Sequence, residues 1–225
     1  MKRARFMFAS VLVLQLIVLP GAFADSSDAP VQPVTPTTAE QYLERGISRL
    51  NAQAPISAIE DMDQAILLSA NDARAYLLRA YARDKVTAVI RPGAGKFETY
   101  EFVGQCLPRS SSNRNCVRWE QSISDYSQVL NLSTDVRLQL KARIGRGNAR
   151  YRYGDRDSAL ADLDEAIRLD PENAFAYFSR GRVRSNRDGE GVRRDWQKAA
   201  ELYRIQGDFA SADDLQQALN GGRLL

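Results

Sequence analysis

The chain has 225 residues and a formal net charge of +3, with no histidine and only two cysteines. This length suits one domain. Without histidine, two cysteines do not make the usual four-ligand zinc site. No set of nucleophile, base and orienting group accompanies them, so neither an enzyme nor a metal protein is expected.

The first residues have the pattern of a secretory signal peptide. A basic start precedes an apolar run at 6–19, which ends at Pro20 and is followed by the small residues Ala22 and Ala24. This order matches a signal peptidase site, so we expect residues 1–24 to be removed on export to the periplasm or the exterior. An uncleaved anchor is the alternative, but the run is shorter than the roughly 20 apolar residues that span a bilayer.

Cleavage would leave the mature chain close to electrically neutral. The signal contains three of the 31 basic residues and no acidic one, so 28 Lys and Arg would face 28 Asp and Glu. The general positive field that favours nucleic acid or anionic lipid is then missing. We therefore expect a protein or peptide partner, and neither nucleic acid, a small-molecule substrate nor a stable membrane span.

A linker is expected between the signal and the folded part. Residues 25–38, DSSDAPVQPVTPTT, contain three prolines and almost nothing to bury, which predicts an extended segment. Thr37 and Glu40 have the spacing of a capping box, so the first helix is expected to begin there.

From residue 39 onward one pattern recurs with a period of about 34 residues. The best copy has small and large apolar residues at fixed spacing, namely Gly147, Ala159, Leu163, Ala166 and Pro171. The first copy repeats the spacing with Tyr42, Gly46, Ala58, Met62 and Ala65, and has Ala70 where proline is usual. The chain therefore resembles the tetratricopeptide repeat family. Because of its signal-like first residues, we interpret it as an exported member of that family.

The resemblance implies an all-α fold, a solenoid of antiparallel helix pairs with about four repeats. The domain is expected at 39–220, with repeats at 39–72, 73–136, 140–173 and 174–206, a cap helix at 208–219 and a tail at 221–225. Small residues let the two helices of a pair approach closely. One pair cannot bury its own apolar face, which is why the copies are stacked in series.

The second repeat is interrupted by an insertion, expected at 86–117. FETYEFV at 97–103 alternates polar and apolar residues, which predicts a hairpin-like excursion. Cys106 and Cys116 are expected to form a disulfide that closes this insertion, because an even pair in an exported chain is usually oxidised. The insertion is mildly basic and is one candidate contact surface for an acidic partner.

The other candidate surface is one face of the first helix of each repeat. In the family, repeat positions 2, 5, 9 and 12 share a helical face and line the concave groove. The groove residues expected here are Leu43, Ile47, Leu50, Leu77, Tyr81, Lys141, Ile144, Asn148, Tyr151, Phe175, Phe178 and Arg182. Such a mixture suits a docked helix or peptide. The same residues can also pack between repeats, and the sequence leaves both roles open.

A second regularity is that all four copies have arginine at position 7 and aspartate at position 23. The pairs are Arg45 with Asp61, Arg79 with Asp125, Arg146 with Asp162, and Arg180 with Asp195. Both positions lie on the packing sides of their helices, so the side chains are expected to face each other. Arginine and a carboxylate form a planar paired contact that lysine does not reproduce. We interpret the pairs as structural and not as a ligand-binding row.

No cofactor is expected. GAGK at 93–96 resembles part of a phosphate loop, but Ile90 and Phe97 replace the first glycine and the magnesium-binding Ser or Thr. The resemblance implies an exported interaction module that holds a peptide or helix in its groove, as an adaptor or assembly factor in the cell envelope. The alternative is a structural or self-associating module, in which the insertion makes the contact and homo-oligomers form.

Overall fold

The computed structural model describes residues 35–89, 114–185 and 188–221. Over these residues the chain forms helices and no strand, so the expected all-α fold is confirmed for this part. The helices belong to one compact unit, Pro36–Leu225. They are α1 (Ala39–Asn51), α2 (Pro55–Leu68), α3 (Ala73–Val89), α4 (Arg114–Leu132), α5 (Val136–Tyr153), α6 (Arg156–Leu169), α7 (Ala174–Arg184), α8 (Gly189–Ile205) and α9 (Phe209–Asn220).

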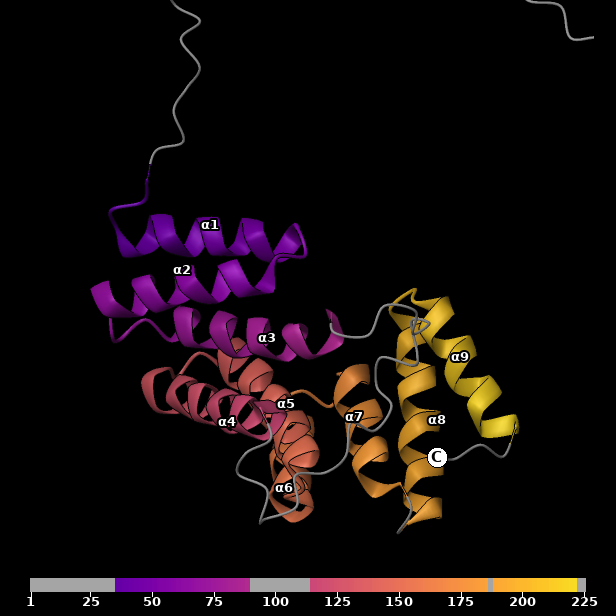
Figure 1. Ribbon diagram of the computed structural model, residues 1–225. Coiled ribbons are helices and arrows are strands. Elements are labelled where there is room, and N and C mark those ends of the chain that lie inside the picture. The colour runs from indigo at the N-terminus through magenta and orange to yellow at the C-terminus, as the bar shows by residue number, and fades with distance from the viewer. Residues whose placement is uncertain (1–34, 90–113, 186–187, 222–225) are drawn as a thin grey trace, which may run out of the picture. The chain divides into compact units, whose positions relative to one another are not determined.

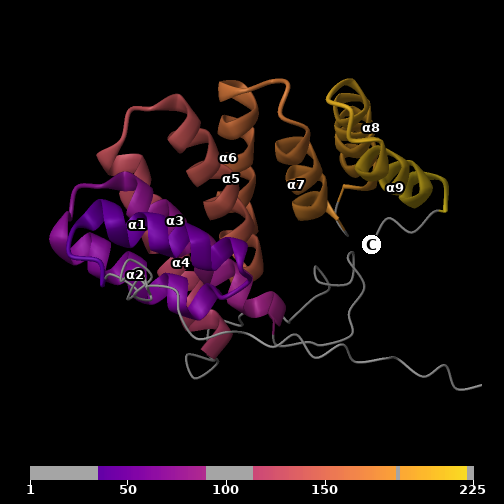
Figure 2. The same ribbon diagram turned by 90° about the horizontal axis from the view of Figure 1, so that it is seen from above.

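Consecutive helices pack against each other in chain order (Figure 1). Within the repeats, extensive contacts join the helix pairs α1–α2, α3–α4, α5–α6 and α7–α8, and α4 contacts α5 of the next repeat just as extensively. Short turns connect three of these pairs, which makes their helices antiparallel. Figure 2 shows α7, α8 and α9 following one another at the end of this series.

The first helices of the pairs form a layer of their own. α1 contacts α3, α3 contacts α5, and α5 contacts α7. Within the described residues, the second helices α2, α4, α6 and α8 have no comparable contacts with one another. The first helices therefore lie closer together than the second helices, as expected on the inner side of a curved array.

Small residues permit the close approach within each pair. A Cβ atom added at Gly147 would lie 2.9 Å from Leu163 Cγ and 3.2 Å from the Ala159 carbonyl oxygen. Leu163 and Ala159 are fully buried, in a core cluster that also contains Ile144 and Ala166. Because interiors are close-packed, any larger side chain at 147 forces these helices apart or displaces Leu163.

The two ends of the helix array are covered differently. On α3, the face that packs against the preceding helix carries Ala75 and Ala82, both fully buried. The corresponding positions of α1 are Gln41, Glu44 and Ser48, which are polar and exposed. The outer face of α1 is therefore polar and solvent-exposed, as the outer face of a terminal repeat must be for solubility.

At the other end, α9 covers the apolar side of α8. Leu215 and Leu219 of α9 are buried in one cluster with Val192 and Trp196 of α8. Asp208 caps α9 by accepting a hydrogen bond from the Ser211 amide at 3.1 Å. The preceding Gly207 has a positive φ of 80°, a conformation that glycine adopts without strain.

The start of α1 differs by one residue from the predicted capping box of Thr37 and Glu40. The N-cap is Thr38, whose hydroxyl accepts from the Gln41 amide at 3.3 Å. The Gln41 side chain in turn accepts from the backbone N–H of Thr38 at 3.3 Å and of Thr37 at 2.9 Å. Glutamine can close a capping box as well as glutamate, and this alternative register was not considered.

Helix ends near the second and third repeats also differ from the expected bounds. α3 continues to Val89 and α4 begins at Arg114, so the predicted insertion at 86–117 starts and ends inside helices. Val86 is buried, which explains why helix continues past the predicted boundary. α5 begins at Val136, one turn before the predicted repeat start, because Asp135 caps it with a 2.7 Å hydrogen bond from the Arg137 amide.

The predicted strand-like segment at 97–103 and Cys106 lie outside the described residues. Cys116 is buried beside Trp119 in the first turns of α4. The disulfide between the two cysteines therefore stays a prediction. Within the described residues, no helix is both long and apolar enough to cross a membrane.

Candidate functional site on the first-helix face

The twelve predicted groove residues, which we call the first-helix face, differ in exposure. Four are exposed, namely Ile47, Tyr81, Lys141 and Phe175. Six are half-buried, namely Leu50, Leu77, Asn148, Tyr151, Phe178 and Arg182. The remaining two, Leu43 and Ile144, are buried.

Burial corrects the prediction for Leu43 and Ile144. Leu43 is 2% exposed and packs with Met62 and Ala65 of α2. Ile144 is 7% exposed and lies in the cluster around Leu163. Both occupy position 5, where the side chain faces the second helix of its own repeat as much as the inner side of the helix array. They belong to the core and offer a partner almost no surface.

Asn148 has a packing role in addition to its place on the face. Its side-chain amide donates to Ser179 Oγ at 3.2 Å, which links α5 to α7. This contact between repeats occupies the side-chain amide group of Asn148, which could otherwise donate a hydrogen bond to a bound peptide.

Aromatic rings and guanidinium groups lie together on α5, α6 and α7. The Arg182 guanidinium lies 6.0 Å from the Tyr151 ring centre and 5.7 Å from that of Phe178. Arg156 of α6 lies 5.5 Å from the same Tyr151 ring and donates to the Ser185 carbonyl at 2.8 Å. Cation–π contacts of this kind hold a guanidinium in place over the ring.

The aromatic side chains of α7 continue into α8. The Phe175 and Phe178 rings are 6.1 Å apart, as are the Phe178 and Trp196 rings. Trp196 is buried, and its indole N–H donates to the Phe178 carbonyl at 3.3 Å. The half-buried Phe178 thus packs against Trp196 of α8, while Phe175 stays exposed.

A half-buried carboxylate lies near Tyr81 on the same side of α3. Asp84 accepts a hydrogen bond from the Tyr126 hydroxyl at 2.9 Å, and Arg152 lies 4.0 Å away. Burial raises the pKa of Asp84 above its ordinary value, and Arg152 only partly opposes this. Burial, and then the charge of Asp84, raises the pKa of Tyr126. Lys85 lies over the Tyr81 ring at 5.1 Å.

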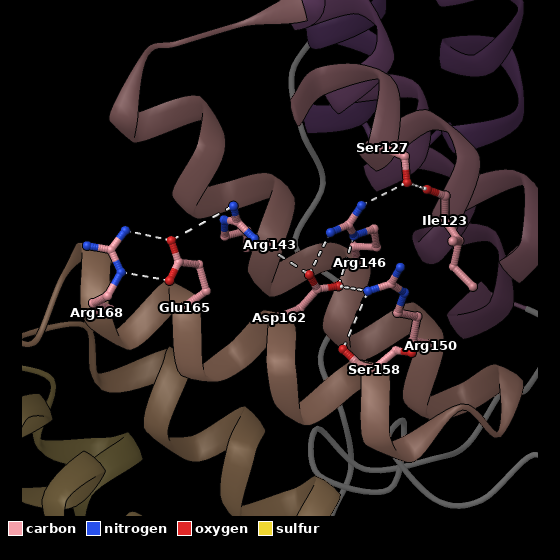
Figure 3. Close-up of polar contacts among 9 residues, drawn as sticks. All are labelled: Ile123, Ser127, Arg143, Arg146, Arg150, Ser158, Asp162, Glu165 and Arg168. Atoms are coloured by element: carbon pink, nitrogen blue, oxygen red, sulfur yellow. Dashed lines mark hydrogen bonds and ion pairs between the residues drawn. The ribbon is translucent and has the colours of Figure 1, made fainter. Parts of the chain in front are cut away.

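The structure brings together all four predicted arginine–aspartate pairs. The shortest nitrogen–oxygen distance is 2.6 Å in each, for Arg45 with Asp61, Arg79 with Asp125, Arg146 with Asp162, and Arg180 with Asp195. The four aspartates are buried. In the third repeat, Arg146 contacts both oxygens of Asp162, through Nε at 2.8 Å and Nη2 at 2.6 Å (Figure 3).

A second arginine in each repeat was missed by the sequence analysis. The residue at position 11, one turn after the first arginine, also reaches the same carboxylate. Arg150 donates to Asp162 at 2.6 Å (Figure 3) and Arg184 donates to Asp195 at 2.9 Å. The other members are Arg49 with Asp61 and Arg83 with Asp125. The signal was present as Arg-x-x-x-Arg in every copy, since residues four apart share a helical face.

The position 7 arginines also join one repeat to the next. Arg79 donates to Asp63 of the preceding repeat at 2.6 Å, and Arg180 donates to Asp164 at 2.7 Å. Arg146 instead donates to the Ser127 hydroxyl at 3.0 Å (Figure 3). We use the name arginine ladder for these residues together. It comprises the arginines at positions 7 and 11, the aspartates at position 23, and the junction residues Asp63, Ser127 and Asp164.

The first repeat has no preceding junction among the described residues, and its arginine is more exposed. The side chain of Arg45 is 37% exposed, against 16–17% for the arginines at the same position in the other three repeats. Tyrosines support three of these arginines: Tyr42, Tyr76 and Tyr177 lie 5.4–5.5 Å from the guanidinium groups.

The carboxylates of the ladder are compensated by its arginines. Burial alone would lower the pKa of Arg180, but hydrogen bonds to Asp195 and Asp164 outweigh it and raise that pKa. Burial lowers the pKa of Arg83, against the attraction of Asp125. Partly buried charges are tolerated only when paired and hydrogen-bonded, so each aspartate depends on its arginines. The ladder is therefore structural and leaves the exposed side chains of the first-helix face for other contacts.

The described residues offer binding groups and no evident reaction centre. Within them, no group of three or more His, Cys, Asp or Glu side chains could hold a metal ion. Apart from the neutral amide of Asn148, the exposed and half-buried side chains of the first-helix face are aromatic, aliphatic or cationic, which suits recognition of a partner.

No protein-family model matches the chain, and no curated protein matches it. Among solved structures, it is similar to a crystal structure of the MamA protein, with a TM-score of 0.54, 18% identity, and 76% of each chain covered. A second crystal structure of MamA gives a TM-score of 0.50 at 18% identity, covering 80% of this chain and 78% of that one. The likeness concerns the fold alone and supports a tetratricopeptide-like helical repeat fold for this chain.

Proposed function

We propose that the protein is an exported, non-enzymatic adaptor that binds a peptide or helix of a partner protein on its first-helix face. One observation carries the proposal: Ile47, Tyr81 and Phe175 are large apolar side chains that remain exposed, one on each of the first helices α1, α3 and α7. Exposed aromatic and aliphatic groups along adjacent helices are typical of helix- or peptide-binding surfaces. Export rests on the signal-like residues 1–24 and on the expected cleavage after Ala24.

The ladder explains how such a surface is kept rigid. Arg79 and Arg180 each contact aspartates of two successive repeats, so neighbouring pairs are linked on the side away from the first-helix face. A rigid surface loses little conformational entropy when it binds, which favours affinity.

Site-specific photo-crosslinking in the native host tests this proposal. A photoreactive residue is placed at Tyr81 or Phe175, and a matched one at Leu67, which is exposed on the second helix α2. We expect one protein partner to crosslink from the two first-helix sites and not from Leu67. Equal crosslinking from all three sites, or crosslinking from Leu67 alone, contradicts the proposal. Amino-terminal sequencing of the exported protein should give Asp25 as the first residue.

A further inference from the structure

The first-helix face is not uniform along the array. On α1 and α3 its charges compensate each other, because Arg74 contacts Glu40 at 2.6 Å and Asp72 at 2.7 Å. On α5 and α7, positions 2, 5, 9 and 12 hold no acidic residue at all. Those positions instead carry Lys141 and Arg182 among aromatic and aliphatic side chains.

Two buried acidic residues that contact α5 and α7 are already paired with arginines. Asp162 of α6 accepts from Arg146 and Arg150, and Asp195 of α8 accepts from Arg180 and Arg184. These carboxylates are buried on the side of the helices that faces the pair. They are balanced by ladder arginines, so they do not offset the positive charge of the first-helix face.

Stacking orients the cations of this region for further contacts. Tyr151 has Arg182 at 6.0 Å and Arg156 at 5.5 Å from its ring centre. A guanidinium stacked on a ring keeps its N–H groups around the edge, where they can donate to a carboxylate in a forked geometry. Lys141 is exposed on the same face of α5 and adds a third positive charge.

We propose that this part of the face, namely Lys141, Tyr151, Phe175, Phe178 and Arg182, together with the adjoining Arg156 of α6, binds an acidic peptide segment of the partner. The assignment rests on the proposed function and adds the chemistry of the partner to it. Carboxylates of the segment contact Lys141, Arg156 and Arg182, and an apolar side chain between them contacts Phe175 and Phe178. A nucleic acid is disfavoured, because the mature chain would have equal numbers of basic and acidic residues and lacks an extended positive field.

Fluorescence anisotropy with the mature chain tests the assignment. The probes are three labelled 12-residue peptides that share their Phe and Leu residues and carry Glu, Gln or Lys at all other positions, and a 12-nucleotide thymidine oligonucleotide. We expect the Glu peptide to bind at least about tenfold more tightly than the Gln peptide, with an affinity that falls as salt is raised. The Lys peptide should not bind.

Variants connect the binding to the named residues. Lys141→Gln and Arg182→Gln should each weaken the Glu peptide several-fold, and together by about tenfold, without changing the affinity for the Gln peptide. Arg193→Gln, at an exposed arginine of α8, is the matched control and should have no effect. Because Arg182 is half-buried, circular dichroism must show unchanged helix content in its variant, and Lys141→Gln alone provides a second test at an exposed position.

Each outcome decides between the two proposals. Equal affinity for the Glu and Gln peptides overturns the acidic assignment and leaves the proposed function standing. Tighter binding of the oligonucleotide than of the Glu peptide overturns the assignment in favour of nucleic acid. If no peptide binds, the assignment is wrong, and crosslinking from Phe175 then decides on its own whether a protein partner occupies the face.

Discussion

Arg146 donates a hydrogen bond to the hydroxyl of Ser127 at 3.0 Å, across the junction between the second and third repeats. At the two equivalent junctions the arginine meets a carboxylate, Asp63 or Asp164. The second junction is therefore the only one of these three whose contact is to a neutral group. Hydrogen bonds between ions are stronger than those with one neutral partner.

Replacing Ser127 by aspartate should therefore stabilise the protein. Ser127→Asp supplies the carboxylate that the other junctions have, and the expected gain in the free energy of unfolding is about 0.5–1 kcal/mol. Urea denaturation measures it. The control is Gln128→Asp, at an exposed neighbouring position. A loss of stability specific to position 127 would show that Arg146 cannot take a second charged partner.

Asp162 is expected to depend strongly on its arginines. Asp162→Ala leaves Arg146 and Arg150, whose side chains are 16% and 23% exposed, without their carboxylate, and should lower stability by about 2–4 kcal/mol. Adding Arg146→Ala to that variant should lower it little further. A double-mutant cycle of unfolding free energies measures the coupling. Fully additive losses would reject a direct pairing.

Gly147 is expected to tolerate no side chain. Gly147→Ala places a Cβ 2.9 Å from Leu163 Cγ and should cost about 1–3 kcal/mol through overpacking. Gly189 is the matched control, because nothing lies within 4 Å of a Cβ built there. Gly189→Ala should change stability by less than about 0.5 kcal/mol. Equal effects at both positions, measured by thermal unfolding, would mean that helix approach does not depend on Gly147.

Asp84 is expected to make stability depend on pH. Burial raises its pKa in the folded protein, so the folded state holds this proton more tightly than the unfolded chain does. Ionisation of Asp84 therefore opposes folding at pH values above its folded pKa, and the penalty disappears below its unfolded pKa of about 3.9. Asp84→Asn should stabilise the protein at pH 7.

The gain from Asp84→Asn should shrink as the pH is lowered toward 4. Tyr126, Arg152, Lys85 and Ser122 face this carboxyl group and remain in the variant. The measurement is the difference in unfolding free energy between variant and parent at several pH values, which cancels the titration of all other groups. A gain that is constant with pH, or a loss at pH 7, contradicts a raised pKa at Asp84.

The sequence predicted contacts within a repeat better than contacts between repeats. Arg146 and Asp162 could be paired because repeat spacing alone places positions 7 and 23 on facing sides. The contact of Arg146 with Ser127 depends on the orientation of one helix pair relative to the next. The spacing of residues within a repeat gives no information about that orientation. The second arginine, Arg150, follows Arg146 by four residues, so its place on the same helical face could be predicted from the sequence.

The candidate site was predicted with similar limits. Tyr81 and Phe175 were placed on an exposed face by helical periodicity, and both are exposed. Leu43 and Ile144 follow the same periodicity, yet both are buried, because they pack into the core clusters that contain Met62 and Leu163 of their own second helices. The stacking of Arg182 on Tyr151 joins two repeats and could not be predicted from spacing within one.

The central claim is that the first-helix face binds the partner, and the most direct measurement is a titration followed by two-dimensional NMR. The mature chain, labelled with ¹⁵N, is titrated with the partner segment identified by crosslinking. The largest changes in amide signals should fall on α1, α3, α5 and α7, centred on Tyr151, Phe175 and Phe178, with little change in α2 and α4. Changes concentrated on the second helices, with the first helices unaffected, would contradict the account.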